Sequence, residues 1–277
     1  RVQPDCLHIA TEGPLGWAAR GVALRRGWPF TTAYHSRFPE YVQARVHVPL
    51  DWSYALLRRF HNAAQATLAP TPAIVTDLVQ RGFTRARLWS RGVNLEAFTP
   101  QGPRLPRSHV PVFLYVGRLA VEKQVQAFLS LDLPGEKWVA GTGPEEAKLK
   151  RQFPGVRWFG VLSGDELAAV YRTADVMVFP SVTDTFGLVM AEAMACGTPV
   201  AAYPVPGPID VVGHYSPGGV LDKDLRAACL AALKKPRDAV RRHAEQFNWP
   251  AATRQFEQAL APLPHARAAA VPSSAAV

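Results

Sequence analysis

Cysteine is scarce in this sequence: its 277 residues contain only Cys6, Cys196 and Cys229. They lie far apart, and the lack of a Cys-x-x-Cys pair excludes a zinc or dithiol redox centre built on that motif. The sequence also has no apolar run of the roughly 18–20 residues that span a bilayer, and its first residues lack the pattern of a signal peptide. We therefore expect free, buried thiols in a reducing cytoplasm and no membrane-spanning helix.

Acidic residues are outnumbered by basic ones, 22 to 31, which gives the chain a net charge of +9. This balance favours an anionic partner. The basic residues form short pairs such as Arg58-Arg59, without the zinc-finger or aromatic motifs of nucleic-acid-binding domains. We therefore expect a nucleotide diphosphate or an anionic membrane surface as the partner, and no nucleic acid. A basic surface that only faces solvent is the alternative.

Low-complexity sequence is confined to the end of the chain. With 48% hydrophobic and 19% charged residues, the composition is that of a globular protein with one large domain or two. The Ala-, Ser- and Pro-rich stretch 263–277 predicts a disordered tail. A Pro- and Arg-rich stretch at 101–111 predicts a linker between two domains, 1–100 and 112–247, and the helix expected at 248–262 follows the second domain.

Short apolar runs alternate with helical spacing in both domains. In the first domain we expect strands at 6–10, 30–35, 67–69 and from Leu88, and helices at 15–27, 51–66 and 72–82. In the second we expect strands at 112–116, 138–140, 156–159, 176–179 and 199–202, and helices at 120–130, 144–152, 163–173 and 186–195. The alternation predicts an α/β fold with a doubly wound parallel sheet, in which ligands bind outside the carboxyl ends of the strands.

Charged side chains follow two strands of the second domain. Arg118 and Lys123 come after its first strand, and two fixed cations can clamp a diphosphate. Asp184 comes after its fourth strand, and Glu192 lies two turns into the next helix. Both carboxylates can accept hydrogen bonds from sugar or ribose hydroxyls, and the helix N-terminus between them attracts phosphate. The pattern predicts a site for a nucleoside diphosphate that carries an attached group.

Each of these residues also has a simpler interpretation. The two cations could be solvated surface charges, and Asp184 could serve only as a helix N-cap. Glu192 lies in an apolar helix, where an unpaired carboxylate is costly, so we expect it to have a functional partner. Gly141 and Gly143 follow the second strand, and we interpret them as positions where backbone approaches a ligand closely.

Several motifs, in a fixed order, carry a family resemblance. The segment 184–212, DTFGLVMAEAMACGTPVAAYPVPGPIDVV, has an acidic residue, seven residues and then Glu, followed by GxPV. GRLAVEK, GTGP and ADVMVFPS precede it. These motifs resemble the large family of retaining glycosyltransferases that includes bacterial glycolipid mannosyl- and glucosyltransferases, sucrose-phosphate synthase and sulfoquinovosyl transferase. TEGPLG and FTTAYHSRFPEY are similar to bacterial GDP-mannose-dependent α-mannosyltransferases.

The resemblance implies a GT-B fold, with two Rossmann-like domains facing a cleft and the front strands of the first domain missing. The residues that match its catalytic positions are Arg118, Lys123 and Asp184. The residues that match its donor-binding positions are Gly117, Gly141, Gly143, Val161, Leu162, Phe186, Gly187, Leu188 and Glu192. Among these, Val161 and Leu162 lie beside the base and Glu192 binds the ribose. Asp184 stands where the wider family usually has Glu, so its reach is one methylene shorter.

On the acceptor side, Glu12 and His35 match loops that face the cleft. Many relatives have His-Glu-Pro near the first position, but this chain has Thr11-Glu12-Gly13-Pro14, without the histidine. His35 could instead be a loop histidine with only structural partners. In the helix at 51–66 we expect four side chains to pack inside the fold, the alternative being that this helix lies on an acidic membrane. The four are Trp52, Tyr54, Leu57 and Phe60.

The implied reaction transfers a hexose of the mannose or glucose type from a nucleotide-diphospho-sugar to a lipid or saccharide acceptor, with retention of configuration. The donor is GDP-mannose or a UDP-sugar, and we expect no metal or cofactor. We expect the protein in the cytoplasm, peripheral on the inner membrane face. The alternative is a non-catalytic remnant that only binds nucleotide, because strands without their sheet partners leave this chain inactive and poorly stable. A sugar epimerase of related fold lacks the acidic signature.

Overall fold

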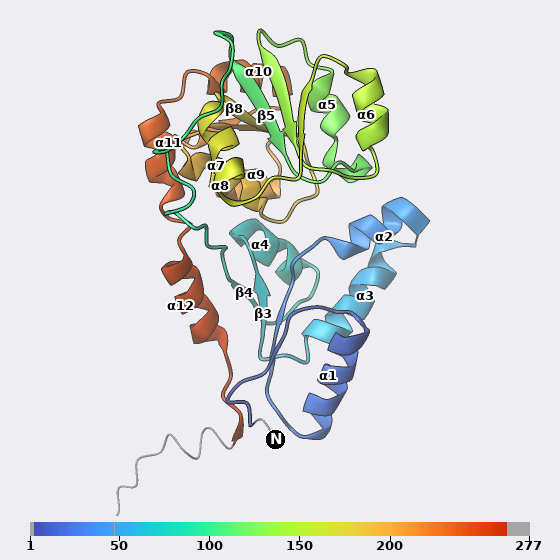
Figure 1. The fold of residues 1–277 in the computed structure, drawn as a ribbon. Helices are drawn as coiled ribbons and strands as arrows, with labels where there is room; N and C mark the ends of the chain where they lie inside the picture. The colour runs from blue at the N-terminus through green and yellow to red at the C-terminus, as the bar shows by residue number, and fades with distance from the viewer. Residues whose placement is uncertain (1–2, 47, 265–277) are drawn as a thin grey trace, which may run out of the picture. The chain divides into compact units, whose positions relative to one another are not determined.

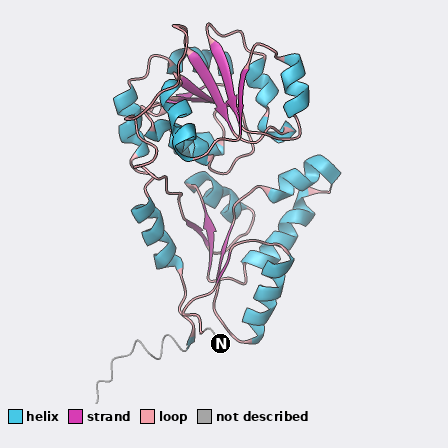
Figure 2. Ribbon diagram, viewed as in Figure 1, coloured by secondary structure: helices cyan, strands magenta, loops and turns pink. Residues whose placement is uncertain are grey.

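The computed structural model describes residues 3–46 and 48–264, which fold into two compact units. Unit 1 holds the residues up to Ser90 and those from Ala252 on, and unit 2 runs from Arg91 to Ala251. Each unit is a sheet flanked by helices (Figures 1 and 2). None of the helices in these residues is long and apolar enough to cross a membrane.

Unit 1 is built on a four-stranded parallel sheet in the order β1-β2-β3-β4. Its strands are β1 (His8–Ile9), β2 (Thr31–Ala33), β3 (Ala66–Ala69) and β4 (Ala86–Leu88). Its helices are α1 (Pro14–Arg25), α2 (Phe38–Val46), α3 (Leu50–His61), α4 (Pro72–Gln80) and, crossing from unit 2, α12 (Trp249–Ala259). The helix expected at 51–66 ends at His61, because the chain must turn before β3; α2 was not predicted from the sequence.

Helices cover both faces of this sheet. On one face the inner side of α3 contributes Tyr54, Leu57 and Phe60, which are buried. On the other, Phe256 and Ala259 of α12 join a cluster with residues of β2 and β3. The expected inward packing is thus confirmed for three of the four residues of α3. It is wrong for Trp52, which is 76% exposed.

Unit 2 is built on a six-stranded parallel sheet in the order β10-β9-β8-β5-β6-β7. Its strands are β5 (Val112–Val116), β6 (Glu136–Ala140), β7 (Arg157–Gly160), β8 (Val176–Phe179), β9 (Val200–Ala202) and β10 (Gly219–Leu221). Its helices are η1 (Val121–Lys123, a 3₁₀ turn), α5 (Val125–Leu129), α6 (Glu146–Gln152), α7 (Gly164–Thr173), α8 (Leu188–Ala195), α9 (Pro206–Val211), α10 (Leu225–Ala232) and α11 (Arg237–Ala244). The elements after β9 were not predicted.

Strand β5 shows why this sheet is wound on both sides. Its five residues are all buried, and alternate residues belong to different cores. Leu114 packs in the cluster that includes α7, α8 and α11, whereas Phe113 packs in the cluster that includes α5 and α10. A strand that is buried on both faces has a continuous run of apolar residues in its sequence. The predicted doubly wound α/β fold is therefore confirmed.

The stretch at 101–111 is not a free linker. It packs on α7, where Leu105 N donates to Thr173 Oγ1 over 2.8 Å. In the same helix Arg172 donates from Nε to the Pro103 carbonyl over 2.9 Å. The Pro- and Arg-rich composition suggested a linker between the domains, but the backbone of this stretch is hydrogen-bonded to α7 within unit 2. In the stretch expected to be a tail, Leu263 is buried, and residues 265–277 lie outside the described residues.

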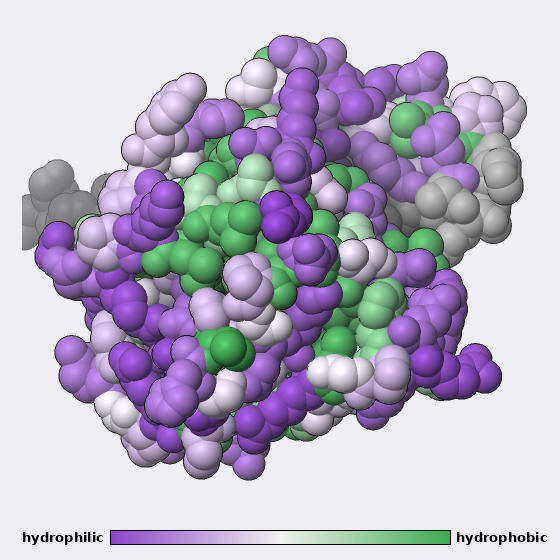
Figure 3. All heavy atoms as spheres, turned by 90° about the horizontal axis from the view of Figure 1, so that it is seen from above, coloured by the Kyte–Doolittle hydropathy of each residue, from purple (hydrophilic) through white to green (hydrophobic). Residues whose placement is uncertain are grey.

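The surface is mostly hydrophilic, as expected for a chain of this composition. Seen from above, purple residues cover most of the visible face and apolar residues gather in a few patches (Figure 3). Large apolar side chains that stand exposed include Leu15, Trp52, Leu56, Val161 and Tyr215. Single exposed apolar residues are common on proteins, so only those with a consistent pattern call for an explanation.

His8 makes the stability of unit 1 dependent on pH. Its Nδ1 lies 2.8 Å from Thr31 Oγ1, and its ring packs edge-on against Phe256. Burial, reinforced by the positive charge of His35, lowers the His8 pKa from 6.5 to about 4.

We expect the free energy of unfolding to fall as the pH drops from 6.5 to about 4, because only the unfolded chain takes up the His8 proton in that range. Thermal unfolding measured across this range checks the expectation. His8→Gln, which cannot titrate, should show a smaller decrease over the same range. Parallel curves for the two proteins would contradict it.

Candidate active site

Lys123 and Asp184 meet at the carboxyl ends of two neighbouring strands. Lys123 ends η1, which follows β5, and Asp184 lies in the loop after β8; β5 and β8 pair in the sheet. Lys123 Nζ lies 2.5 Å from Asp184 Oδ1. Both side chains keep about a fifth of their surface exposed, 21% and 18%. We expected these two residues, which are distant along the chain, to lie together, and in the fold they do.

A break in the expected helix at 120–130 gives Lys123 this position. Gln124 adopts a left-handed conformation, with φ of 51°, between η1 and α5. Left-handed backbone is uncommon for a residue other than glycine. The turn separates η1 from α5, so Lys123 lies at the rim of the sheet instead of within a continuous helix.

Arg118 lies on the same loop but faces solvent more. Its guanidinium is 56% exposed and lies 3.7 Å from the Glu122 carboxylate. The hydroxyl of Tyr115, in β5, donates to the Arg118 carbonyl over 2.9 Å. Burial raises the Tyr115 pKa, and the negative charges of Asp184 and Glu122 raise it further. Tyr115 therefore lies among the charged residues of the site, although within an apolar run nothing in the sequence distinguished it.

The loop after β8 contains buried polar atoms that no protein group satisfies. Ser181 Oγ, Thr183 Oγ1 and Asp184 Oδ2 have no hydrogen-bond partner within the described residues. Buried polar atoms are almost always hydrogen-bonded, so three in one short loop call for an explanation. They lie in the same loop as the Asp184 carboxylate, whose other oxygen contacts Lys123.

Helix α8 begins without a side-chain cap. Its N-cap is Gly187, in the left-handed conformation with φ of 79°, and no side chain caps the first turn. A Cβ at Gly187 would lie 2.7 Å from Met190 Cε and 2.9 Å from Phe179 Cζ, so the position requires glycine. Asp184 is therefore not the N-cap of α8, which removes the simplest alternative for it. Phe186 is buried and Leu188 is 41% exposed.

Glu192 has a protein partner. The hydroxyl of Tyr171, in α7, donates to Glu192 Oε2 over 3.0 Å. Burial raises the Glu192 pKa, and the hydrogen bond from Tyr171 opposes this change. The sequence indicated that this carboxylate needs a partner, but it did not indicate Tyr171, which comes from another helix. No contact joins Glu192 to Lys123 or Asp184 within the described residues.

The glycines after β6 are required by a neighbouring loop. A Cβ at Gly141 would lie 2.0 Å from the Gly117 carbonyl oxygen, and one at Gly143 would lie 2.3 Å from that of Leu119. The close approach that we attributed to a ligand is thus, in this structure, an approach between the loops that follow β5 and β6. Beyond β7, Val161 is 74% exposed, whereas Leu162 packs partly against the core.

The acceptor-side residues lie in unit 1. Glu12 Oε1 lies 2.9 Å from Nε2 of His61, and Nδ1 of this fully buried histidine lies 2.9 Å from Thr32 Oγ1. His35 is exposed, with its ring 6.1 Å from that of Trp89. His61 was not predicted from the sequence. Its spacing of four residues from Leu57 placed it on the inner face of α3, and this was the only signal for it.

One Asp-x-Asp sequence, Asp222-Lys223-Asp224, is present in unit 2. Asp224 caps α10, accepting from Arg226 N and Ala227 N, and Asp222 accepts from Asp224 N. No group of three or more His, Cys, Asp or Glu side chains in the described part of the chain could hold a metal ion. These two acids have a structural role in capping the helix.

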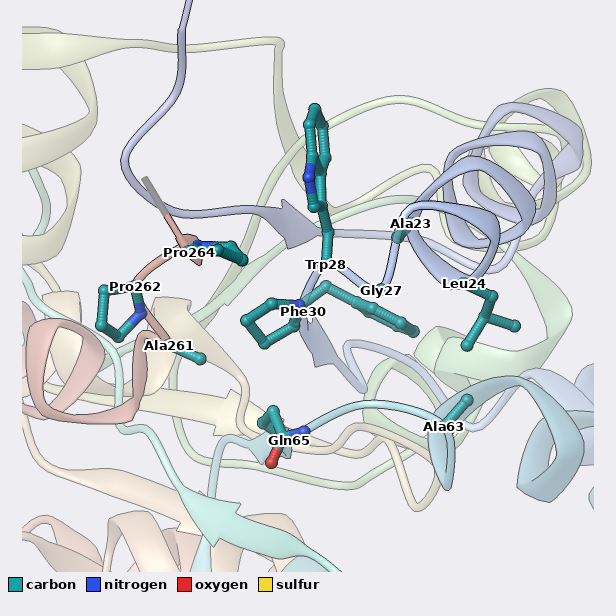
Figure 4. Close-up of a pocket in the computed structure, with 11 residues that line it drawn as sticks. Ala23, Leu24, Gly27, Trp28, Phe30, Ala63, Gln65, Ala261, Pro262 and Pro264 are labelled. Atoms are coloured by element: carbon teal, nitrogen blue, oxygen red, sulfur yellow. The ribbon is translucent and has the colours of Figure 1, made fainter. Parts of the chain in front are cut away.

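A pocket of about 680 Å³ lies in unit 1 and is separate from these residues. Figure 4 shows that most of the side chains around it are apolar, among them Trp28, Phe30 and Pro262. Gln65 is the one polar side chain that it labels. With no titratable group in its lining, this pocket offers no chemistry, although it is larger than the hollow beside η1, of about 120 Å³.

Comparisons with known proteins show the family of this chain. Residues 110–235 match the family described as "Glycosyl transferases group 1", and residues 1–97 match "Glycosyltransferase Family 4". The chain belongs to the group 1 glycosyltransferases. The matches together cover both units, so the family assignment does not depend on the acidic signature alone.

Two relatives and one solved structure show which glycosyltransferases this chain is similar to. It is 32% identical to the sulfoquinovosyl transferase SQD2 of Arabidopsis thaliana, over 91% of this chain and 56% of the relative. It is 31% identical to a GDP-mannose-dependent α-mannosyltransferase of Mycolicibacterium smegmatis, over 89% of this chain and 70% of the relative. The structure of sucrose-phosphate synthase from Thermosynechococcus elongatus matches 91% of this chain and 71% of its own, with a TM-score of 0.73 at 24% identity. The fold is of the GT-B type.

Proposed function

We propose that this glycosyltransferase binds a nucleotide-diphospho-sugar in unit 2 and transfers its hexose to a lipid or saccharide acceptor with retention of configuration. The observation that carries the proposal is the contact of Lys123 with Asp184, in a loop with three buried polar atoms that have no partner among the residues the structure describes. A cation next to a carboxylate suits a ligand that is anionic on one side and rich in hydroxyls on the other. A sugar diphosphate has that composition.

Each charged residue has a role in this proposal. Arg118 and Lys123 bind the diphosphate and stabilise the charge that develops as it leaves. Asp184 accepts hydrogen bonds from hydroxyls of the transferred sugar, using the Oδ2 that has no protein partner. Glu192 binds the ribose, held in place by Tyr171. Val161, exposed beyond β7, offers an apolar surface to the base.

Backbone groups complete the donor site. The first turn of α8, at Phe186, Gly187 and Leu188, directs N–H groups toward the phosphates, because the first turn of a helix leaves its amides unpaired. Gly117, Gly141 and Gly143 have no side chain, so the loops after β5 and β6 can approach each other closely and no side chain fills the space beside Lys123. Leu162 supports the loop that presents Val161.

The reaction needs no protein nucleophile. The acceptor hydroxyl attacks the anomeric carbon from the face on which the diphosphate leaves, the bond from that carbon to the phosphate oxygen breaks, and the departing phosphate takes the hydroxyl proton. The protein contributes positioning and charge stabilisation. Glu12 and His35 are proposed to contact the acceptor. Lys123, released from Asp184 by the incoming diphosphate, becomes available for the leaving group.

The donor is GDP-mannose or a UDP-sugar, of which GDP-mannose is favoured by the mannosyltransferase relative. We place the protein in the cytoplasm, which the free thiols of Cys6, Cys196 and Cys229 suit. Determination of the anomeric configuration of the transferred sugar by NMR tests the stereochemistry. A product with the same configuration as the donor supports the proposal, and an inverted product contradicts it.

Asp184→Ala separates sugar binding from diphosphate binding. Calorimetry should show that GDP-mannose binds the wild-type chain more tightly than GDP does, and that this advantage is lost in the variant, because the carboxylate that accepts the sugar hydroxyls is gone. We expect the loss to be about tenfold, the worth of one hydrogen bond to a charged group. GDP itself should bind at least as well as before, since Lys123 no longer has an internal partner.

UDP and UDP-glucose form the second pair of ligands in this experiment. If Asp184→Ala weakens the sugar-free nucleotide as much as the sugar nucleotide, Asp184 does not contact the sugar. If neither pair binds the wild-type chain, the function proposed here is wrong for this chain, and the alternative of a non-catalytic remnant that binds nucleotide is also excluded. Binding of nucleotides without turnover of any donor favours that remnant.

A further inference from the structure

His61, in the last turn of α3, connects two segments of unit 1 that are distant along the chain. Its Nε2 lies 2.9 Å from Glu12 Oε1, in the loop after β1, and its Nδ1 lies 2.9 Å from Thr32 Oγ1, in β2. The Thr32 hydroxyl lies 3.2 Å from that of Thr67, in β3. Glu12 belongs to the segment TEGPLG and Thr32 to FTTAYHSRFPEY. These are the two segments in which the sequence placed acceptor-side residues, and a residue outside both of them joins them.

The His61 ring is held in one orientation. It has no exposed surface, and it packs edge-on against Phe60, with the ring centroids 5.0 Å apart, and 5.7 Å from the ring of Phe83. Both ring nitrogens have a hydrogen-bond partner, so the imidazole cannot turn without losing both contacts. An ionised carboxylate only accepts hydrogen bonds, so Nε2 carries a proton and donates to Glu12. The ring is therefore a fixed donor directed at one carboxylate oxygen.

The loop that contains Glu12 is also held in place. A Cβ at Gly16, in the first turn of α1, would lie 2.0 Å from the Thr11 carbonyl oxygen, so the backbone beside Glu12 packs directly on this helix. The Glu12 side chain keeps 23% of its surface exposed, whereas His61 keeps none. Oε1 contacts His61, and in residues 3–46 and 48–264 the structure gives Oε2 no hydrogen-bond partner. Glu12 thus has one oxygen bound inside the fold and one available to accept another hydrogen bond.

Burial of His61 does not by itself require an acid as the partner. A backbone carbonyl satisfies an imidazole N–H, and His243 of unit 2 shows this arrangement, with Nε2 3.0 Å from the Val211 carbonyl oxygen. Glu12 instead follows β1, at the carboxyl ends of parallel strands, where ligands bind in sheets of this type. A functional side chain keeps its geometry when hydrogen bonds from residues locked by packing support it. The contact therefore serves Glu12 more than it serves His61.

We propose that His61 is a positioning residue of the transfer reaction: it holds Glu12 by Oε1, so that Oε2 accepts a hydrogen bond from a hydroxyl of the acceptor. This inference rests on the proposed function, in which Glu12 contacts the acceptor. The attacking oxygen must lie close to the anomeric carbon and in line with it, and a restrained carboxylate aligns an acceptor better than one that rotates freely. Thr32 contributes through the ring, because its hydroxyl fixes the other nitrogen.

Acceptor kinetics distinguish positioning from folding. The acceptor probes are octyl α-mannoside and dioctanoylglycerol, one saccharide and one lipid, each offered with GDP-mannose and with UDP-glucose. His61→Leu fills a similar volume but cannot donate. It should raise the acceptor KM at least about tenfold, because Glu12 loses a hydrogen bond to a charged group, and it should leave the donor KM unchanged. His61→Gln retains an N–H that reaches toward Glu12 and should recover most of the loss; equal defects in the two variants contradict the proposal.

A double-mutant cycle shows whether His61 acts through Glu12. Glu12→Ala should also raise the acceptor KM, and adding His61→Leu should cause no further change, since the residue that His61 holds is already gone. A merely structural role would make the two effects additive, because lost packing does not depend on Glu12. Thr32→Val should raise the acceptor KM less than His61→Leu does. Thr67→Val, which removes a hydroxyl one step further from the ring, is the matched control and should leave it unchanged.

Histidine 15N NMR tests the contact without relying on a folded His61→Leu variant. The Nε2 proton that disappears in His61→Gln should exchange slowly in the wild-type chain, because the ring is fully buried. Its resonance should shift in Glu12→Ala, which replaces a partly exposed side chain, and an unchanged resonance overturns the inference.

Failure of this inference and failure of the proposed function give different results. A wild-type chain that transfers sugar, with His61→Leu unaffected, overturns the inference alone. A chain that binds a donor but transfers to neither probe contradicts the role of Glu12 toward the acceptor, and the inference with it, but leaves nucleotide binding in place. If calorimetry detects no binding of GDP-mannose or UDP-glucose to the wild-type chain, the proposed function is wrong and the inference that rests on it is withdrawn.

Discussion

Replacing Arg118 and Lys123 together by alanine is expected to weaken binding of GDP or UDP more than a hundredfold. A hydrogen bond to a charged group contributes about 1.5–3 kcal/mol, so loss of two such groups costs about 3 kcal/mol or more. Lys123 has the larger share, because its side chain is 21% exposed whereas that of Arg118 is 56% exposed, and electrostatic interactions are stronger where water is excluded. Isothermal titration calorimetry measures both single variants and the pair.

The control is a second pair of cations in the same unit. Lys150→Ala with Arg151→Ala, on α6, removes the same charge from a helix where Lys150 pairs with Glu146 and lies over the ring of Trp158. It should change nucleotide affinity little beyond a small effect that salt removes. If the α6 pair weakens binding as much as the pair at the strand ends, general attraction by a basic protein explains the affinity. The assignment of a diphosphate clamp would then be wrong.

Gly141→Ala is expected to destabilise unit 2 by about 3 kcal/mol or more. The added Cβ would lie 2.0 Å from the Gly117 carbonyl oxygen, and its contact is backbone that cannot rotate away. The position also has φ of 131°, which L residues rarely adopt. A clash costs about 1–3 kcal/mol and unfavourable backbone costs about 1–2 kcal/mol more. Denaturant unfolding, followed by tryptophan fluorescence, gives the change in free energy.

Gly155→Ala is the matched control for this prediction. A Cβ added at Gly155 would have no heavy atom within 4 Å, and the residue has no positive φ. The same substitution should therefore change the free energy of unfolding by less than about 0.5 kcal/mol. Equal stability of the two variants would show that the loops after β5 and β6 separate easily. The close approach of these two loops, which we assign to the donor site, would then not be required by the fold.

The fold of unit 2 was the easiest part to predict. The apolar run of β5 and the glycines at the ends of β5, β6 and β7 indicate a parallel sheet buried on both faces, and the structure confirms this. The break at Gln124 could not be predicted, because residues 120–130 have uninterrupted helical spacing. Tertiary packing of the two short pieces overrides that local preference. The same break decides where Lys123 lies.

The site residues also divide into those that could be predicted from the sequence and those that could not. Arg118, Lys123 and Asp184 could be singled out because charged residues at strand ends of a doubly wound sheet converge on one edge. Tyr115 and Tyr171 could not be singled out. A tyrosine in an apolar strand or helix has the same sequence context whether its hydroxyl contacts solvent or another group of the protein. His61 contacts both Glu12 and Thr32 only because α3 packs on β2. Local spacing along the chain does not show which side chains of different elements contact one another.

Helix α3 shows the limit most directly. Its sequence places Trp52 and Tyr54 two residues apart, and therefore on opposite sides of the helix. Both are large aromatic residues of the kind that fill cores, so residue type did not show which of the two is buried. Only the direction in which the helix packs makes Tyr54 buried and Trp52 exposed. By itself the sequence determined the family, the alternation of strands and helices in the second unit as far as β9, and the charges at its strand ends, because these depend on local pattern. The tertiary structure alone decided which carboxylates and hydroxyls are paired and which faces meet solvent, because burial depends on neighbours that are distant along the chain.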